Sequence, residues 1–181
     1  MVVPSNIGTT LLEAIIVLLL ISILLIIAVP IGRDYIARSH VTTATYQIVN
    51  ALNMGRVSAI ERGMSVTFCH SNDGIDCNGD WSEGQILFFD QQGNGRVDTG
   101  DEVIRVWQAD KFAVQINWRG FFSNRIIQMD PSGMGKAMSG SFIICPISGK
   151  SQYARAIIVS RNGRARISKV DSQGGALQCT A

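Results

Sequence analysis

Near its start the chain reads Gly8-Thr9-Thr10-Leu11-Leu12-Glu13, which leads into the uncharged apolar run Ala14–Val29 and then Pro30. About 20 apolar residues are enough for a helix to cross a bilayer. A carboxylate just inside such a helix costs free energy unless it is paired, so Glu13 marks a functional position. Pro30 predicts a kink, because proline removes one helical hydrogen bond.

Two simpler explanations account for less of this stretch. A secretory signal peptide has a basic amino-terminal region and a small-residue cleavage site after its apolar core. The segment Met1–Gly8 contains no Lys or Arg, and no such site follows the run before Pro30. A plain membrane anchor explains the hydrophobicity but not the placement of Gly8, Glu13 and Pro30.

The spacing of Gly8, Glu13 and Pro30 resembles the prepilin signal of the type IV pilin and type II secretion pseudopilin superfamily. The resemblance implies that a prepilin peptidase and N-methyltransferase cleaves after Gly8 and methylates Thr9, the new amino terminus. It also implies that Glu13 helps the subunit to dock onto other pilin subunits in a helical filament. The leader lacks the usual basic residue, and Thr9 stands where the family prefers Phe or Met.

The resemblance divides the chain into four parts. These are a prepilin leader (1–8), the transmembrane or filament-core half of a helix (9–30), its amphipathic half (31–63) and a β-rich head (64–181). The precursor would cross the bacterial inner membrane once, with its head in the periplasm. The subunit would be extracellular when it is assembled into a pilus.

Beyond Pro30, the apolar residues recur every three or four positions and predict a helix that continues to about Arg62. Gly63 is a good helix terminator. The expected buried stripe consists of Val41, Ala44, Ile48, Ala51 or Leu52, Gly55 and Ala59.

After Gly63, short runs of strand-forming residues are separated by Gly, Asn and Asp. The expected strands are Ser65–His70, Gln85–Asp90, Val103–Gln108, Ala113–Trp118, Arg125–Met129, Ser141–Pro146, Ala154–Arg161 and Arg164–Val170. The sequence therefore predicts an α+β fold, with a long N-terminal helix packed against an antiparallel β-sheet head. Trp81, Trp107 and Trp118 are expected in its core.

The four cysteines, Cys69, Cys77, Cys145 and Cys179, predict two disulfides, because the head would be extracytoplasmic. Three pairings are possible. Proximity along the chain favours Cys69–Cys77 and Cys145–Cys179.

Charge is unevenly distributed along the chain. Asp34–Glu102 contains ten acidic and four basic residues, whereas Val103–Ala181 contains three acidic and eleven basic residues. This asymmetry indicates an anionic partner for the basic half.

The basic residues gather around an expected C-terminal hairpin, in which Asn162-Gly163 forms a two-residue type I′ turn. In that register Arg161 faces Arg164 and Val159 faces Arg166, all on one face. The other face carries Ala156, Ile158, Ala165 and Ile167 and is expected to face the core. The candidate anion-binding residues are Arg161, Arg164 and Arg166, with Arg155 further along and Lys150 and Lys169 as weaker additions. A solvated, edge-protecting hairpin is the alternative.

The string Gly163-Arg164-Ala165-Arg166 resembles the G-R-x-R signature of FimT-type minor pilins in the GspH/FimT branch of the superfamily. The stretches Trp81–Asp90 and Asp90–Glu102 and the Pro131-Ser132-Gly133 turn are similar to that branch as well. This resemblance implies binding of double-stranded DNA during natural transformation. The alternative is a GspH-like structural tip pseudopilin of a type II secretion system.

Two segments invite a metal-binding interpretation. Asp90–Glu102 partly matches an EF-hand loop, but Gln92 and Asp101 are poor ligands at their positions and strands flank the loop, so a hairpin turn is favoured. A zinc cluster of Cys69, His70, Asp73, Asp76 and Cys77 matches no standard spacing.

Catalytic motifs are missing from the sequence. It contains two histidines, His40 and His70, no G-x-S-x-G string and no Walker loop. We therefore expect no catalytic residues, no metal, no cofactor and no enzymatic activity.

Overall fold

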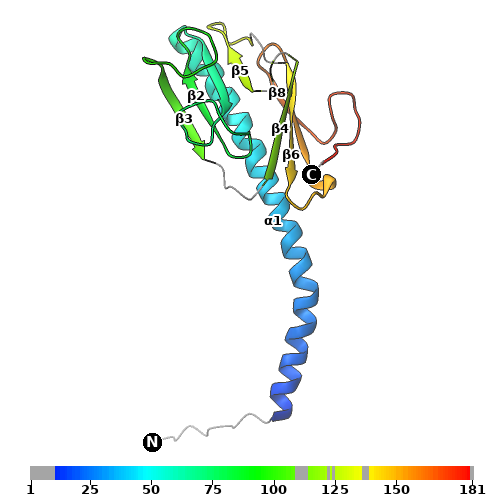
Figure 1. The fold of residues 1–181 in the computed structure, drawn as a ribbon. Coiled ribbons are helices and arrows are strands. Elements are labelled where there is room, and N and C mark those ends of the chain that lie inside the picture. Colours follow the sequence, from blue (N-terminus) through cyan, green and yellow to red (C-terminus); the bar gives the residue numbers. More distant parts are fainter. Residues whose placement is uncertain (1–10, 109–113, 122, 124, 136–138, 180–181) are drawn as a thin grey trace, which may run out of the picture. The chain divides into compact units, whose positions relative to one another are not determined.

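The structure is a computed structural model that describes residues 11–108, 114–121, 123, 125–135 and 139–179. Gly8 and Thr9, at the expected cleavage site, lie outside this part. Helix α1 (Leu11–Arg62) comes first and a β-rich region follows (Figure 1). Its elements are β1 (Val66–His70), β2 (Gly84–Phe89), β3 (Glu102–Gln108), β4 (Val114–Gly120), β5 (Ile126–Met129), β6 (Gly140–Pro146), the 3₁₀-helix η1 (Ser151–Tyr153), β7 (Arg155–Val159) and β8 (Ala165–Ser168).

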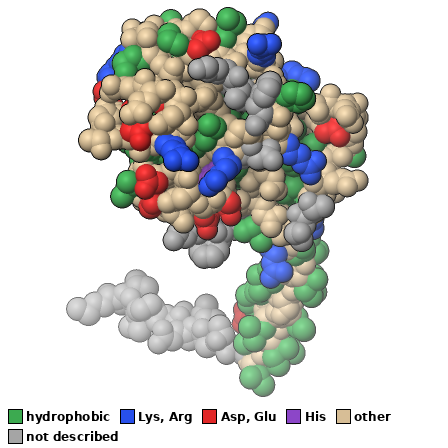
Figure 2. Space-filling model, turned by 45° about the horizontal axis from the view of Figure 1, so that its top comes forward, with side chains coloured by type: hydrophobic (Ala, Val, Ile, Leu, Met, Phe, Trp, Pro, Cys, Tyr) green, Lys and Arg blue, Asp and Glu red, His purple; other side chains and the backbone are tan. Residues whose placement is uncertain are grey.

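The chain divides into two compact units, Met1–Ile36 and Ala37–Ala181. In the first unit α1 carries exposed apolar side chains between Leu11 and Ile31, and Figure 2 shows hydrophobic side chains along this segment. Within the described part of the chain, α1 is the helix that is long and apolar enough to cross a membrane. The helix continues through Pro30, and the kink expected there stays a prediction.

In the second unit α1 buries one stripe of side chains, as its periodicity predicts. The buried residues are Val41, Thr45, Ile48, Ala51, Leu52, Gly55 and Ala59, while Ala44 is half-buried. The helix ends where expected, because Gly63 adopts a positive φ of 63°. The Met64 N–H then donates to the Ala59 carbonyl at 3.2 Å, which is a Schellman motif.

Two four-stranded antiparallel sheets follow, with strand orders β3-β2-β1-β5 and β4-β6-β7-β8 (Figure 1). The eight predicted strands are confirmed with bounds that differ by no more than two residues. Each sheet joins segments that are distant in sequence, which the local pattern did not predict.

One hydrophobic core joins the buried stripe of α1 to one face of each sheet. Trp81 lies at its centre, with ring centroids 5.2 Å from Phe68 and 5.0 Å from Phe142. Trp118 is also buried, and Trp107 packs against the core from the side. These contacts confirm the α+β class and the expected role of the tryptophans.

The cysteines pair as Cys69–Cys77 and Cys145–Cys179, the pairing that sequence proximity favours. The second disulfide ties the C-terminal segment to β6. There Leu177 is buried against Ile143 and Ala156, on the face of the β4-β6-β7-β8 sheet that points away from α1. We call this the outer face.

Candidate nucleic-acid interface

The C-terminal hairpin turns through three residues, Arg161-Asn162-Gly163. The Gly163 N–H donates to the Ser160 carbonyl at 2.9 Å, and the Ser160 N–H donates to the Arg164 carbonyl at 3.0 Å. A type I′ turn needs positive φ at both central residues. Gly163 has a φ of 73°, but Asn162 does not have a positive φ, so the connection is a type I turn followed by a glycine bulge.

The longer turn shifts the pairing of β7 and β8 by one residue from the predicted register. Val159 pairs with Ala165 and Ile158 pairs with Arg166. The prediction that Arg161 faces Arg164 and Val159 faces Arg166 is therefore wrong. Because a one-residue shift exchanges the faces of a strand, part of the predicted core face is wrong too.

The observed faces of the hairpin follow from the new register. Ile157 and Val159 are in the core, and Ala165 packs against it, whereas Ala156 and Ile158 lie on the outer face. A tertiary contact accounts for the choice of turn. The Gly135 N–H donates to the Arg161 carbonyl at 3.0 Å, and a Cβ on Gly163 would lie 2.8 Å from the Gly133 carbonyl oxygen.

The outer face brings together arginines from both edge strands of the sheet. Strand pairing aligns Arg119 on β4 with Ser141, Ser141 with Ile158, and Ile158 with Arg166 on β8. Arg164 lies two residues before Arg166 and so points to the same side. We call Arg119, Arg164 and Arg166 the arginine face. Three strand spacings separate the backbones of Arg119 and Arg166 by about 14 Å.

These guanidinium groups are available to a ligand. Arg119, Arg164 and Arg166 are exposed, and so is Arg161 in the turn. Within the described part of the chain, none of the four guanidinium groups forms an ion pair or a hydrogen bond. Like charges on one face repel each other, so an anion bound between them would be stabilised.

The other three predicted basic residues do not join the arginine face. Arg155 pairs with the core residue Ile144, and its Nη1 donates to the Ala154 carbonyl at 2.8 Å. Lys150 follows the far end of β6, with its Nζ 5.9 Å from the centre of the Tyr153 ring. Lys169 comes just after β8, in line with the core-facing residues.

Two further arginines lie near the hairpin and are not among the residues that the sequence predicts. Arg119 belongs to a strand that is remote in sequence, although alternating polar residues in β4 indicate an exposed face. Arg56 comes from α1 and packs beneath the turn, with its Cδ 3.5 Å from the position of a Cβ on Gly163. No local pattern identifies Arg56.

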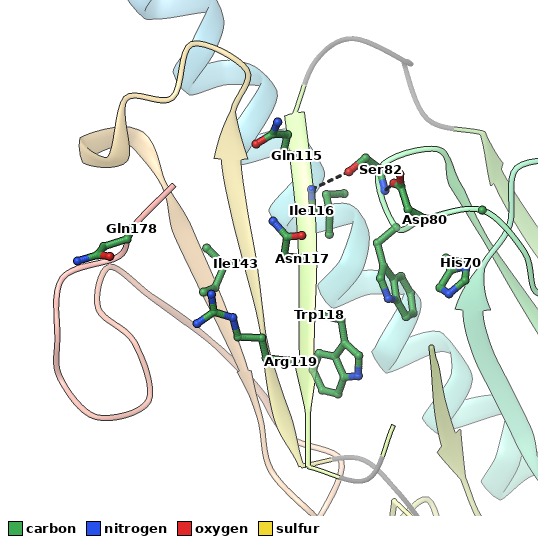
Figure 3. A pocket seen from close by; sticks show the side chains of 12 residues that line it. His70, Asp80, Ser82, Gln115, Ile116, Asn117, Trp118, Arg119, Ile143 and Gln178 are labelled. Carbon is green, nitrogen blue, oxygen red and sulfur yellow. Dashed lines mark hydrogen bonds between the residues drawn. The ribbon is translucent and has the colours of Figure 1, made fainter. Parts of the chain in front are cut away.

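A hollow of about 640 Å³ lies beside β4 (Figure 3). Gln115, Asn117 and Arg119 lie on one side of the strand, and Trp118 lies on the other side with His70 (Figure 3). Among its lining residues, the Ile116 N–H donates to Ser82 Oγ at 2.9 Å, and His70 Nδ1 lies 2.8 Å from the Asn78 carbonyl oxygen. This arrangement contains no nucleophile–base pair within the described residues.

In the two segments considered as metal sites, the carboxylates accept hydrogen bonds from other groups of the protein. Buried Asp90 accepts hydrogen bonds from Thr67 Oγ1 at 2.7 Å, the Gly95 N–H at 2.8 Å and Gln128 Nε2 at 3.0 Å. Asp101 likewise accepts the N–H groups of Gln91 and Asp98. Donors therefore occupy the oxygens that would ligate calcium, which supports a hairpin turn.

The potential ligands in the Cys69–Cys77 loop are also engaged within the protein, because both sulfur atoms form the disulfide. Asp73 accepts the N–H groups of Asp76 at 3.0 Å and Ile75 at 2.8 Å, and Asn78 Nδ2 donates to it at 2.6 Å. These hydrogen bonds hold the pKa of the Asp73 carboxyl well below its usual range. In the described part of the chain, no three His, Cys, Asp or Glu residues are grouped to hold a metal.

Comparison with known proteins identifies the family. The family model described as "Type II transport protein GspH" matches residues 44–163, which is 120 of the 181 residues. Over 174 residues the chain is 28% identical to the pilin-like protein PilA1 of Thermus thermophilus, covering 88% of this chain and 97% of PilA1.

Two solved structures have a similar fold. The type IV minor pilin FimU of Pseudomonas aeruginosa matches with a TM-score of 0.58 at 16% identity, covering 79% of this chain and 97% of FimU. The minor pseudopilin EpsH of the Vibrio cholerae type 2 secretion system matches with a TM-score of 0.51 at 12% identity, covering 71% of this chain and 96% of EpsH. This is a family of structural pilins rather than enzymes, whose members assemble with other pilin subunits. The chain belongs to the GspH family, within the GspH/FimT-like branch of the type IV pilins and pseudopilins.

Proposed function

We propose that this pilin is a minor type IV pilin that binds double-stranded DNA through its arginine face, for DNA uptake in natural transformation. One observation supports the proposal above the others. The exposed Arg119, Arg164 and Arg166 gather on one face without an internal carboxylate partner in the described residues. Arginine suits this role, since its planar fork can donate two hydrogen bonds to one phosphate.

The remainder of the chain would place this face outside the cytoplasm. A prepilin peptidase would cleave after Gly8 and methylate Thr9, and Glu13 would dock the subunit into the filament. The apolar half of α1 would anchor the precursor in the inner membrane, with its head in the periplasm and later on the pilus.

Such a face would bind DNA weakly and without sequence preference. Arg119, Arg164 and Arg166, together with Arg161, would contact three or four phosphates. Release of the corresponding counterions gives a slope of about −3 to −4 for log affinity against log salt concentration. Several subunits along a pilus would add avidity.

The test is DNA binding by the full-length protein in detergent micelles, measured with a blunt duplex at two salt concentrations. Arg164→Ala with Arg166→Ala should lower affinity at least tenfold and reduce the salt slope by about two. The control is Arg96→Ala with Arg125→Ala, because it removes the same net charge from exposed residues elsewhere. An equal loss in both double variants would show that net charge alone drives binding and would contradict the proposed site.

A structural tip pseudopilin of a type II secretion system is the second candidate. The GspH family description and the fold shared with EpsH support it. In that function the head contacts only proteins and gains nothing from a repulsive cationic face. Absence of duplex binding by the wild-type protein at low salt would favour this second candidate.

A further inference from the structure

Among the described residues, the C-terminal segment covers one end of the outer face and leaves the other end open. Leu177 is buried against Ile143 and Ala156. The Cys145–Cys179 disulfide and a 3.0 Å hydrogen bond from the Cys179 N–H to Ser151 Oγ hold the segment there. A ligand on this face is therefore confined to the end near the hairpin turn, where Arg119, Arg164 and Arg166 lie.

A large exposed aromatic side chain lies at the open end. Phe121 is 82% exposed. Its N–H donates to the Ser139 carbonyl at 2.9 Å, so the ladder between β4 and β6 continues past Gly120. Strand alternation then places Phe121 on the outer face beside Arg119, about 7 Å further along the strand.

The cations and the aromatic ring suit different parts of a nucleotide. Guanidinium groups bind phosphates, whereas an exposed phenyl ring offers an apolar surface on which a base can stack. Bases inside a duplex already stack on both sides and present only their edges in the grooves. The ring of Phe121 on a flat sheet face therefore cannot stack on a base in the interior of a duplex, whereas an unpaired base can turn a free face toward it.

We infer that Phe121 stacks on an unpaired base of DNA held by the arginine face, so that duplex DNA with a single-stranded end binds more tightly than a blunt duplex. The inference rests on the proposed function. Arg164 and Arg166 hold the backbone at the β8 edge, and Arg119 holds it beside Phe121 at the β4 edge. At about 3.4 Å per stacked nucleotide, the 14 Å between these edges spans about four nucleotides.

The test compares a blunt duplex with the same duplex carrying a four-nucleotide overhang, using the full-length protein in detergent micelles. The wild-type protein should bind the overhang about tenfold more tightly, which is within the range for stacking of one base on an aromatic side chain. Phe121→Ala and Phe121→Leu should abolish this preference and leave blunt-duplex affinity unchanged. Phe121→Trp should retain it.

The outcomes separate this inference from the proposed function. Equal binding of both DNAs by the wild-type protein would overturn the inference, while sensitivity of blunt-duplex binding to Arg164→Ala with Arg166→Ala would still support DNA uptake. A preference that survives in Phe121→Leu would exclude aromatic stacking. A Phe121→Ala protein that keeps its overhang preference but no longer assembles with other pilins would assign Phe121 to a subunit contact and also overturn the inference.

Discussion

At the scale of single residues, the turn that leads into Arg164 and Arg166 requires a glycine at position 163. The residue has a φ of 73°, and an added Cβ would lie 2.8 Å from the Gly133 carbonyl oxygen. Gly163→Ala should therefore lower the free energy of unfolding by about 2–3 kcal/mol, through backbone strain and the clash together. Urea denaturation of the full-length protein in detergent micelles measures this change.

Gly149→Ala is a matched control for that substitution. Gly149 has a similar φ of 70°, but nothing lies within 4 Å of its Cβ position. Gly149→Ala should therefore lower the free energy of unfolding by only about 1 kcal/mol, which is the cost of a positive φ at a residue other than glycine. If both variants were destabilised equally, the turn would not pack against Gly133 in solution.

A second residue-scale effect concerns acid stability. Because the pKa of Asp73 is lowered in the folded protein, its ionised carboxylate stabilises the fold above the unfolded-state pKa of about 3.9. This stabilisation is lost progressively as the pH falls below about 4. Asp73→Asn should therefore lower the Tm at pH 7, and the Tm values of the variant and the wild-type protein should converge in strong acid.

Thermal unfolding between pH 7 and pH 2 measures this convergence. Asp76→Asn is the control, since it removes an equal charge from an exposed neighbour. A Tm difference for Asp73→Asn that stayed constant over this range would contradict the role of the ionised carboxylate.

At the scale of elements, the two disulfides should contribute unequally to stability. Cys145–Cys179 closes a separation of 34 residues and Cys69–Cys77 one of 8 residues. On the chain-entropy model, replacing both cysteines of Cys145–Cys179 by alanine should lower the free energy of unfolding by about 4 kcal/mol. The same replacement at Cys69–Cys77 should lower it by about 2.5 kcal/mol. Equilibrium denaturation of the two double variants measures the difference. The reverse order would show that lost packing around the short loop outweighs loop closure.

The sequence patterns that predicted the elements are local. Apolar spacing located the stripe of α1 and Gly63 its end, because helix periodicity and capping depend on neighbouring residues. Short strands bounded by Gly, Asn and Asp were located for the same reason. The register of the hairpin could not be predicted in this way, because it depends on tertiary contacts. Arg161 contacts Gly135 and Gly163 packs against Gly133, and these contacts favour a longer turn than Asn-Gly usually forms.

The candidate site shows the same division between local and tertiary information. Arg164 and Arg166 follow from their spacing in one strand. Arg119 can be placed near them only once the pairing of β4 with β6 is known, and Arg56 only once the packing of α1 beneath the turn is known. The excess of basic residues in one half of the chain therefore predicts an anionic partner more readily than it predicts which basic side chains contact that partner.

At the scale of the whole molecule, the residues proposed for assembly and for DNA binding lie in different units. Glu13 lies in the unit Met1–Ile36, and the arginine face lies in the unit Ala37–Ala181. Since the second unit contains its own core and both disulfides, a change in the first should leave the arginine face intact. The two proposed activities should therefore be separable by mutation.

Glu13→Ala should abolish incorporation into filaments and leave duplex affinity in detergent micelles within about twofold of wild type, because it alters no phosphate contact. Arg164→Ala with Arg166→Ala should have the opposite effect, with normal incorporation and at least tenfold weaker DNA binding. Immunoblots of sheared pili and a duplex titration measure the two activities. Loss of incorporation in the arginine double variant would mean that the arginine face contacts neighbouring subunits, and loss of DNA binding in Glu13→Ala would contradict the independence of the two units.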